Sequence, residues 1–210
     1  MSFLNNESEI KGEKEIPRVK IVFPTREKAE EMLVGEILAP LVEDSGVVFE
    51  NTPSITSNFS SSYTNIDIPH GNYDYHAFNK SAISELTITF YMTATTKEEA
   101  DKALATYHFF RTFGKMNFGI NDTNRGLPPQ IFRFSGYGEY MFNRVPVAIR
   151  SFNMPFGEDV DFVQTSHGTA FPSFANCTLT LNMMPSPNKV RSEFSLDGFA
   201  RGDVVKKGYI

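Results

Sequence analysis

A strict two-residue alternation is the feature that most limits the fold of this chain. In "AISELTITFYMTA", residues 82–94, the apolar side chains Leu86, Ile88, Phe90 and Met92 alternate with Glu85, Thr87, Thr89, Tyr91 and Thr93. Successive side chains of a β-strand point to opposite faces of its sheet, so this pattern predicts a strand with one core face and one polar face. The chain must therefore build at least one half-buried β-sheet.

A long helix is predicted directly after this strand. Thr96 and Glu99 match a capping box, and residues 97–113 place apolar side chains at helical spacing, with Gly114 as the expected stop. An earlier segment, residues 26–38, reads as a shorter amphipathic helix that begins at the N-cap Thr25.

The remaining apolar runs are short and flanked by turn residues. They predict a strand from Gly46, a polar strand or hairpin over 52–68, a turn at "PHGN" (69–72), and further strands over 130–136, 145–154 and 176–184. The fold class expected from this order is mainly β (α+β): an antiparallel β-sandwich or barrel with one flanking helix and extended arms at both ends. The expected divisions are an N-terminal arm over 1–45, the β-domain over 46–190, and a C-terminal tail over 191–210.

Charge and cysteine content exclude several classes of protein. A formal net charge of −5 argues against a dedicated nucleic-acid binder, which needs clustered cations. No apolar run reaches the roughly 18 residues that a spanning helix needs, and the polar N-terminus offers no signal peptide. We therefore expect no membrane association and assembly in the cytoplasm. One cysteine, Cys177, allows no intramolecular disulfide and no cysteine-based zinc site.

A cluster of titratable residues in "IDIPHGNYDYHAF", residues 66–78, is the strongest candidate for chemistry. Asp67, His70, Asp74 and His76 could ligate a metal or share a proton. No further His or Cys stands at a ligand spacing from them, and neither Ser81 nor Ser84 has the context of a nucleophile. We interpret the cluster as a turn at an interface; a small-molecule hydrolase or binding protein that uses residues 67–76 is the competing hypothesis.

Several stretches, taken together and in this order, carry a resemblance to one family: "GVVFENTPSIT", "YTNIDIPHGNYDYHAF", "ISELTITFYMTATTKEEADKALATYHFFRTFGKMNFG", "GLPPQIFRFSGYGEYMFNRVPVAIRSFNMPFGEDVDFV" and "SEFSLDGFARGDVVKKGYI". The chain resembles the baseplate tail-tube junction proteins, or tube initiators, of contractile-tailed bacteriophages over roughly residues 37–210. The first 36 residues match nothing in that family.

The resemblance implies a structural virion protein of the tail, not an enzyme, with no cofactor or metal. It implies a homo-hexameric ring that joins the baseplate hub protein to a second junction ring or the tail-tube protein, nucleates the tube and lines a channel. A tape-measure protein and DNA in transit would occupy that channel. A major tail-tube protein, or a tube component of a phage-derived contractile injection system, is the alternative.

Within such a ring, two sets of residues are expected to matter. Tyr73, Tyr75, His76 and Phe78 would lie at a subunit interface, and the polar residues Thr56, Asn58, Thr87 and Thr89 would face the lumen. Ser- and Thr-rich outer faces with few charges would also suit an ordinary solvated sheet, so both readings of that face stay open.

Overall fold

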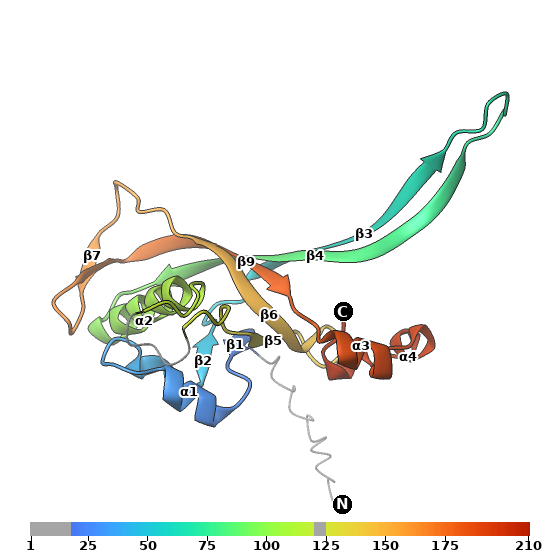
Figure 1. The fold of residues 1–210 in the computed structure, drawn as a ribbon. Helices are drawn as coiled ribbons and strands as arrows, with labels where there is room; N and C mark the ends of the chain where they lie inside the picture. The colour runs from blue at the N-terminus through green and yellow to red at the C-terminus, as the bar shows by residue number, and fades with distance from the viewer. Residues whose placement is uncertain (1–17, 120–124) are drawn as a thin grey trace, which may run out of the picture.

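One antiparallel sheet organises the chain. The computed structural model describes residues 18–119 and 125–210, without the side chains of residues 82–84. The sheet has seven strands in the order β2-β1-β5-β6-β9-β4-β3, and a separate two-stranded sheet pairs β7 with β8 (Figure 1). The strands are β1 (Lys20–Val22), β2 (Gly46–Val48), β3 (Ser54–Ile66), β4 (Tyr75–Thr93), β5 (Phe132–Gly136), β6 (Phe142–Asn153), β7 (Phe162–Gln164), β8 (Ala170–Pro172) and β9 (Phe174–Met183). The prediction of a mainly β, antiparallel fold is confirmed.

The barrel alternative is not formed by one chain. In the described residues the main sheet is open, with β2 at one edge and β3 at the other. Closure within the chain would require these two strands to pair, but β2 has 3 residues, β3 has 13, and five strands separate them.

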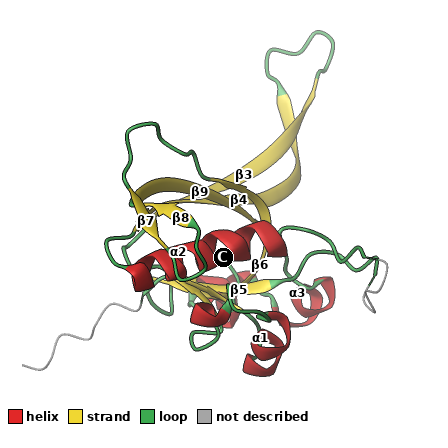
Figure 2. Cartoon of the chain, turned by 90° about the vertical axis from the view of Figure 1, so that its left-hand side faces the viewer, coloured by secondary structure: helices red, strands yellow, loops and turns green. Residues whose placement is uncertain are grey.

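The alternation of residues 85–93 is confirmed by their burial. Leu86, Ile88, Phe90 and Met92 are buried, whereas Tyr91 and Thr93 between them are exposed. The buried face packs against α2 (Lys97–Phe113), the long helix that lies across this side of the sheet (Figure 2). The capping box is confirmed as well, because the Glu99 amide donates to Thr96 Oγ1 (3.3 Å) and the Glu99 carboxylate accepts from the Thr96 amide (3.3 Å). The helix ends at Gly114, as predicted.

The first helix is shorter than expected. Thr25 caps α1 (Arg26–Met32), and its Oγ1 accepts a hydrogen bond from the Lys28 amide, but the helix stops six residues before Leu38. The helix leaves the helical region at Leu33 (φ = −85°, ψ = 62°), and Gly35, with φ = +100°, adopts a left-handed conformation that prevents it from resuming. The following turns bury Leu38 and lead into the short 3-10 helix η1 (Ala39–Leu41).

Residues 18–45, which the sequence suggested as an arm, contribute directly to the core. β1 lies between β2 and β5 in the main sheet. Phe23 then meets Phe113 and Phe132 edge-to-face, with ring centroids 5.3 and 5.0 Å apart, and the ring of Phe109 joins this cluster. Because aromatic pairs of this geometry add to the free energy of burial, the segment stabilises the domain as part of it. Residues 1–17 of the expected arm lie outside the described residues.

The C-terminal segment forms three short helices beside β5 and β6: α3 (Pro187–Glu193), α4 (Leu196–Ala200) and the 3-10 helix η2 (Val205–Lys207). Asn143 Nδ2 on β6 donates to the Lys206 carbonyl (2.8 Å), and Val204 and Val205 are buried. These contacts hold residues 196–207 against the sheet.

A long two-stranded ribbon is the most extended part of the molecule. Residues 86–89 of β4 pair with both β3 and β9, and residues 90–93 pair with β9 alone, whereas residues 75–82 pair with β3 alone. In both views this outer half of the β3–β4 hairpin projects away from the sheet and the helices (Figures 1 and 2). We refer to residues 59–82 as the ribbon. Its two register shifts, between Ser57 and Phe59 and between Ser62 and Tyr63, each place an extra residue on β4.

Candidate interaction surfaces

The polar face of the sheet carries rows of hydroxyl and amide side chains. Strands β6, β9, β4 and β3 run side by side here, and we call the side turned away from α2 the outer face. Cross-strand pairing aligns two rows, Thr56–Thr87–Thr180–Ser151 and Ser54–Thr89–Thr178–Asn153. Such neighbours stand close enough to support one another across the ladder. The result is a wettable wall with no apolar patch along these two rows.

This section of the outer face is nearly free of charge. Among its described side chains, Glu85 on β4 and Arg150 on β6 are the charged ones, and they form an ion pair with each other. Both are partly exposed, at 42% and 51% of their side-chain surface. The face therefore presents a neutral surface to whatever lies beside it.

The four lumen candidates fall within or next to this face. Thr56, Thr87 and Thr89 belong to the two rows, and Asn58 lies opposite the first β4 bulge, near Glu85. The structure thus brings together residues that are about 30 positions apart in sequence. That they face a channel stays a prediction.

The four interface candidates do not share one face. Tyr73 lies in the loop at the end of the ribbon, and Tyr75, His76 and Phe78 follow on β4. Side chains alternate along a strand, so His76 and Phe78 point to one side and Tyr75 to the other. All four are exposed, and Phe78 meets Tyr63 of β3 edge-to-face at 5.6 Å between ring centroids.

The titratable residues of the same region do not form a site. Asp67 accepts a hydrogen bond from Asn65 Nδ2 (2.8 Å), and His70 sits in the turn with φ = +63°. The Gly71 amide donates to the Ile68 carbonyl, so Pro69 and His70 are the central residues of a β-turn with positive φ at its third position. Across the described residues, no group of three or more His, Cys, Asp or Glu could hold a metal ion. The predicted turn at residues 69–72 is confirmed.

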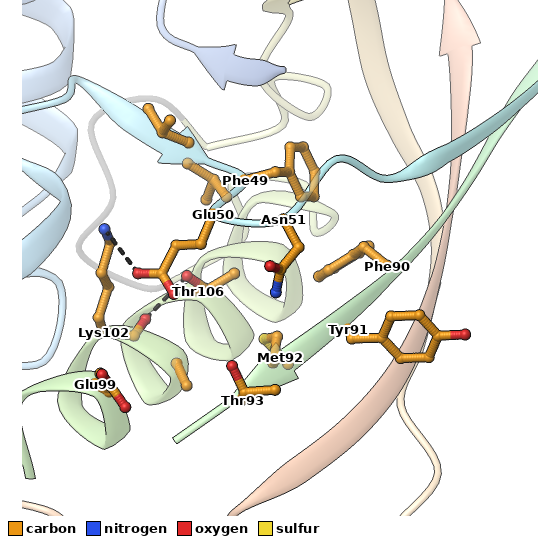
Figure 3. Close-up of a pocket in the computed structure, with 13 residues that line it drawn as sticks. Phe49, Glu50, Asn51, Phe90, Tyr91, Met92, Thr93, Glu99, Lys102 and Thr106 are labelled. Carbon is orange, nitrogen blue, oxygen red and sulfur yellow. Dashed lines mark hydrogen bonds and ion pairs between the residues drawn. The ribbon is translucent and has the colours of Figure 1, made fainter. Parts of the chain in front are cut away.

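A small cavity lies where the start of α2 meets the ends of β2 and β4 (Figure 3). Glu50 and Lys102 point toward each other across it and form an ion pair of 3.1 Å, and Glu99 belongs to the helix cap. The cavity volume is about 40 Å³, which is room for a few water molecules and not for a substrate. With its acids engaged in structural contacts, this cavity is part of the helix packing.

Two further titratable residues have pKa values displaced by burial. Burial raises the pKa of the Cys177 thiol to about 12, which keeps it protonated and unreactive. Burial, followed by the charges of Arg111 and Lys115, lowers the pKa of His108, whose Nδ1 lies 3.3 Å from Arg111 Nη2. Both residues are components of the packed core and its margin.

Among the strand edges without a partner in the described chain, two lie on opposite sides of the four strands of the outer face. β3 is the last strand of the sheet along its whole length, and its sequence "SITSNFSSSYTNI" contains no charged residue and no proline. On the other side, β5 pairs with β6 only up to Val147, so residues 148–153 of β6 have β9 on one side alone. Proteins protect exposed edges with charges, prolines or short length, and β3 has none of these.

Sequence reasoning missed an apolar groove beside the base of the ribbon. It lies between Phe59 on β3 and the C-terminal segment, where Phe194, Leu196 and Phe199 form the opposite wall. The apolar residues at helical spacing in "VRSEFSLDGFA" were the available signal, but the sequence could not show which surface they line.

Known proteins show at most a distant structural similarity to this chain. No protein-family model and no curated protein matches the chain. A solved structure described as the tail of an empty GTA particle, computed with helical refinement and C6 symmetry, is similar over 68% of this chain and 84% of that chain. The TM-score is 0.34 and the sequence identity 10%, a likeness too distant to argue from. In the described part of the chain, no helix is long and apolar enough to span a membrane.

Proposed function

We propose that the chain is a structural subunit of a phage-type tail that assembles into a ring by pairing strand edges between copies. The observation that supports this proposal most directly is that β3 and residues 148–153 of β6 lack a partner on opposite sides of the same four strands. A chain with two different free edges associates head to tail, and such contacts close into a ring when the rotation between copies permits.

Strand directions support this pairing. Each strand in the order β6-β9-β4-β3 is antiparallel to its neighbour, so β3 runs antiparallel to β6. If adjacent copies keep the same orientation of the sheet, β3 of one copy meets β6 of the next as an antiparallel pair. The four-stranded sections then join into one continuous barrel around a lumen.

The outer face suits the wall of that lumen. Its Thr, Ser and Asn side chains and its paired Glu85 and Arg150 offer passing DNA no unpaired cation that would hold the phosphates. The exposed rings on this face, Tyr91 and Phe174, lie beyond the two rows and stack on each other. The finer role follows from the family resemblance of the sequence: a hexameric ring between the baseplate hub and the tail tube, which nucleates the tube. A major tube protein or a component of an injection machine would use the same surfaces.

Negative-stain electron microscopy tests the proposal on the purified chain, alone and mixed with hub and tube proteins. Rings, or short tubes capped by the hub, are expected. Long tubes formed by the chain alone would favour the major tube protein. A chain that stays monomeric with both partners would contradict ring formation and return attention to the residues 67–76.

A proline pair tests the edge directly. Successive backbone amides of a strand point to opposite sides, and proline has no amide hydrogen to donate. One of the two variants Thr56→Pro and Ser57→Pro therefore removes a donor from the free edge of β3, and the other removes a hydrogen bond between β3 and β4. We expect one of the two variants to fold normally, by circular dichroism, and to form no rings. Rings from both folded variants would show that β3 does not pair between copies.

A further inference from the structure

The apolar groove beside the ribbon has a volume of about 930 Å³ and is lined by no charged residue. One wall is the base of the ribbon, with Phe59 and Ser61, and the other is the C-terminal segment, with Phe194 and Leu196. Leu196 is 74% exposed at its rim. A groove of this composition favours an uncharged, partly aromatic occupant.

The same chain carries such an element farther out on the ribbon. β3 has no extra residue at either bulge, so Phe59, Ser61 and Tyr63 continue the face on which Ile55 packs against the core. Tyr63 pairs with Phe78 there, and the two rings are 60% and 58% exposed. We call these two residues the ribbon aromatic pair.

The ribbon has one neutral face and one charged face. Among the described side chains of residues 59–66 and 75–81, the face of the aromatic pair carries no Asp, Glu, Lys or Arg, whereas Lys80 is paired with Ser62 on the other face. Asp67 and Asp74 lie beyond the pair, in the end loop. The neutral face and the neutral groove therefore match in charge and in chemical character.

A chain cannot place its own aromatic pair in its own groove. The pair follows Phe59 and Ser61 along the same continuous ladder, and the ribbon leads away from the C-terminal helices (Figure 1). Folding back would break the β3–β4 ladder between residues 59 and 63. The groove and its complement are thus available only between copies.

We propose that the ribbon aromatic pair, Tyr63 and Phe78, of one copy docks into the groove between Phe59 and Leu196 of a second copy. This inference deepens the proposed self-assembly and rests on it for the presence of a neighbouring copy. The contact is heterologous, so each copy both gives a ribbon and receives one. It adds a second attachment, independent of the strand edges, between copies of the chain.

Photo-crosslinking tests this contact in the full-length chain. The photoreactive residue benzoylphenylalanine is introduced at Phe78, the chain is mixed with isotope-labelled chain without the probe, and mass spectrometry identifies the linked peptides. The matched control carries the probe at Tyr75, which is 57% exposed against 58% for Phe78 but lies on the opposite face of the ribbon. We expect the Phe78 probe to link to residues 187–210 of the labelled chain, and the Tyr75 probe to give no such link.

A groove variant provides the second measurement. Leu196→Glu places a charge at the groove rim and should abolish the Phe78 link, whereas Val34→Glu, at a site 72% exposed just after the end of α1 and outside the groove lining, should retain it. A Phe78 probe that links to another surface, or to no labelled chain, overturns the inference. Rings without the link leave the edge-paired ring standing and reject this contact alone; linked copies that form no rings reject the ring and retain the contact.

Discussion

Glu85 on β4 and Arg150 on β6 form an ion pair across the intervening strand β9, and both lie at β-bulges. Arg150 is the extra residue between Ile149 and Ser151, and Glu85 lies within the register shift between Ile83 and Leu86. Each bulge re-aims a side chain that a regular strand would direct elsewhere. The only charges of this part of the described outer face are thereby brought together and neutralised.

A double-mutant cycle should show that this pair contributes little to stability. Glu85→Gln, Arg150→Gln and the double variant are compared by urea unfolding. Because both side chains are about half exposed, we expect a coupling free energy below about 1 kcal/mol. A coupling of several kcal/mol would mean that the pair, and not the backbone, holds the two bulges in place.

A new cation on the outer face should cause the assembled rings to bind DNA. Thr89→Lys adds a charge next to Thr178 on an unstrained, partly exposed position, so the free energy of unfolding should change by less than about 0.5 kcal/mol. If this face lines a channel, assembled rings of the variant should bind DNA with an affinity that falls steeply with salt.

Thr112→Lys is the control for this experiment. It adds the same charge on the exposed side of α2, away from the outer face. Equal DNA binding by the two variants, measured by fluorescence anisotropy at two salt concentrations, would contradict the assignment of the outer face to the channel.

The aromatic cluster under α2 should dominate the stability of the domain. Phe109 is fully buried and contacts Phe23, Phe113 and Phe132. Phe109→Ala removes these contacts and leaves a cavity, so the free energy of unfolding should fall by about 3–5 kcal/mol. Phe118→Ala, at a ring 72% exposed beside Arg125, should cost less than about 1 kcal/mol in the same denaturation experiment.

His108 should make the domain less stable in mild acid. Burial lowers the pKa of His108 in the folded chain, so the unfolded chain, with a histidine pKa of about 6.5, binds a proton that the folded chain does not. The free energy of unfolding therefore falls as the pH drops from about 6.5, the pKa in the unfolded chain, toward the lower pKa in the folded chain. This part of the stability is fully present above the unfolded pKa of about 6.5.

The variant His108→Gln should have a flatter profile over this pH range. Urea unfolding at several pH values between neutrality and mild acid measures it, with His76→Gln on the exposed ribbon as the control. A wild-type profile that stays parallel to that of His108→Gln would show that this imidazole does not govern the acid response.

Cys177 should resist thiol reagents in the native chain. Its side chain is fully buried and its pKa is raised to about 12 by burial, so the thiolate that reacts is scarce and shielded. Labelling by a chromogenic disulfide reagent should be slow in buffer and complete within the mixing time in denaturant. Rapid labelling of the folded chain would mean that β9 opens locally.

Local patterns in the sequence predicted the elements whose side chains repeat with a regular period. The strand of residues 85–93, the capping box of Thr96 and Glu99, and the turn at Pro69 and His70 all depend on neighbours within a few positions. The extent of the 26–38 helix was wrong, because the backbone leaves the helical region at Leu33 and turns left-handed at Gly35, which composition alone does not impose.

Long-range pairing set the features that sequence reasoning missed. The position of β1 between β2 and β5, the groove beside Leu196, and the pair of Glu85 with Arg150 each join segments dozens of residues apart. A single sequence carries no direct signal for such contacts. The interface candidates Tyr75 and Phe78 are three positions apart in the sequence, so the pleat of β4 places them on opposite faces.

The unprotected edge of β3 has a consequence for the number of copies in a closed assembly. In a barrel the number of strands, their tilt and the total stagger between first and last strand are linked, so only certain combinations close. With four strands from each copy, the offset at which β3 meets β6 decides the circumference. A slip of one residue would place the pleat of β6 out of phase with the pleat of β3 in the next copy. Neither strand can turn over to compensate, because its apolar row is held in the core of its own copy, so the allowed offsets differ by even steps. The number of copies in the ring would then be determined by the register at which β3 of one copy pairs with β6 of the next.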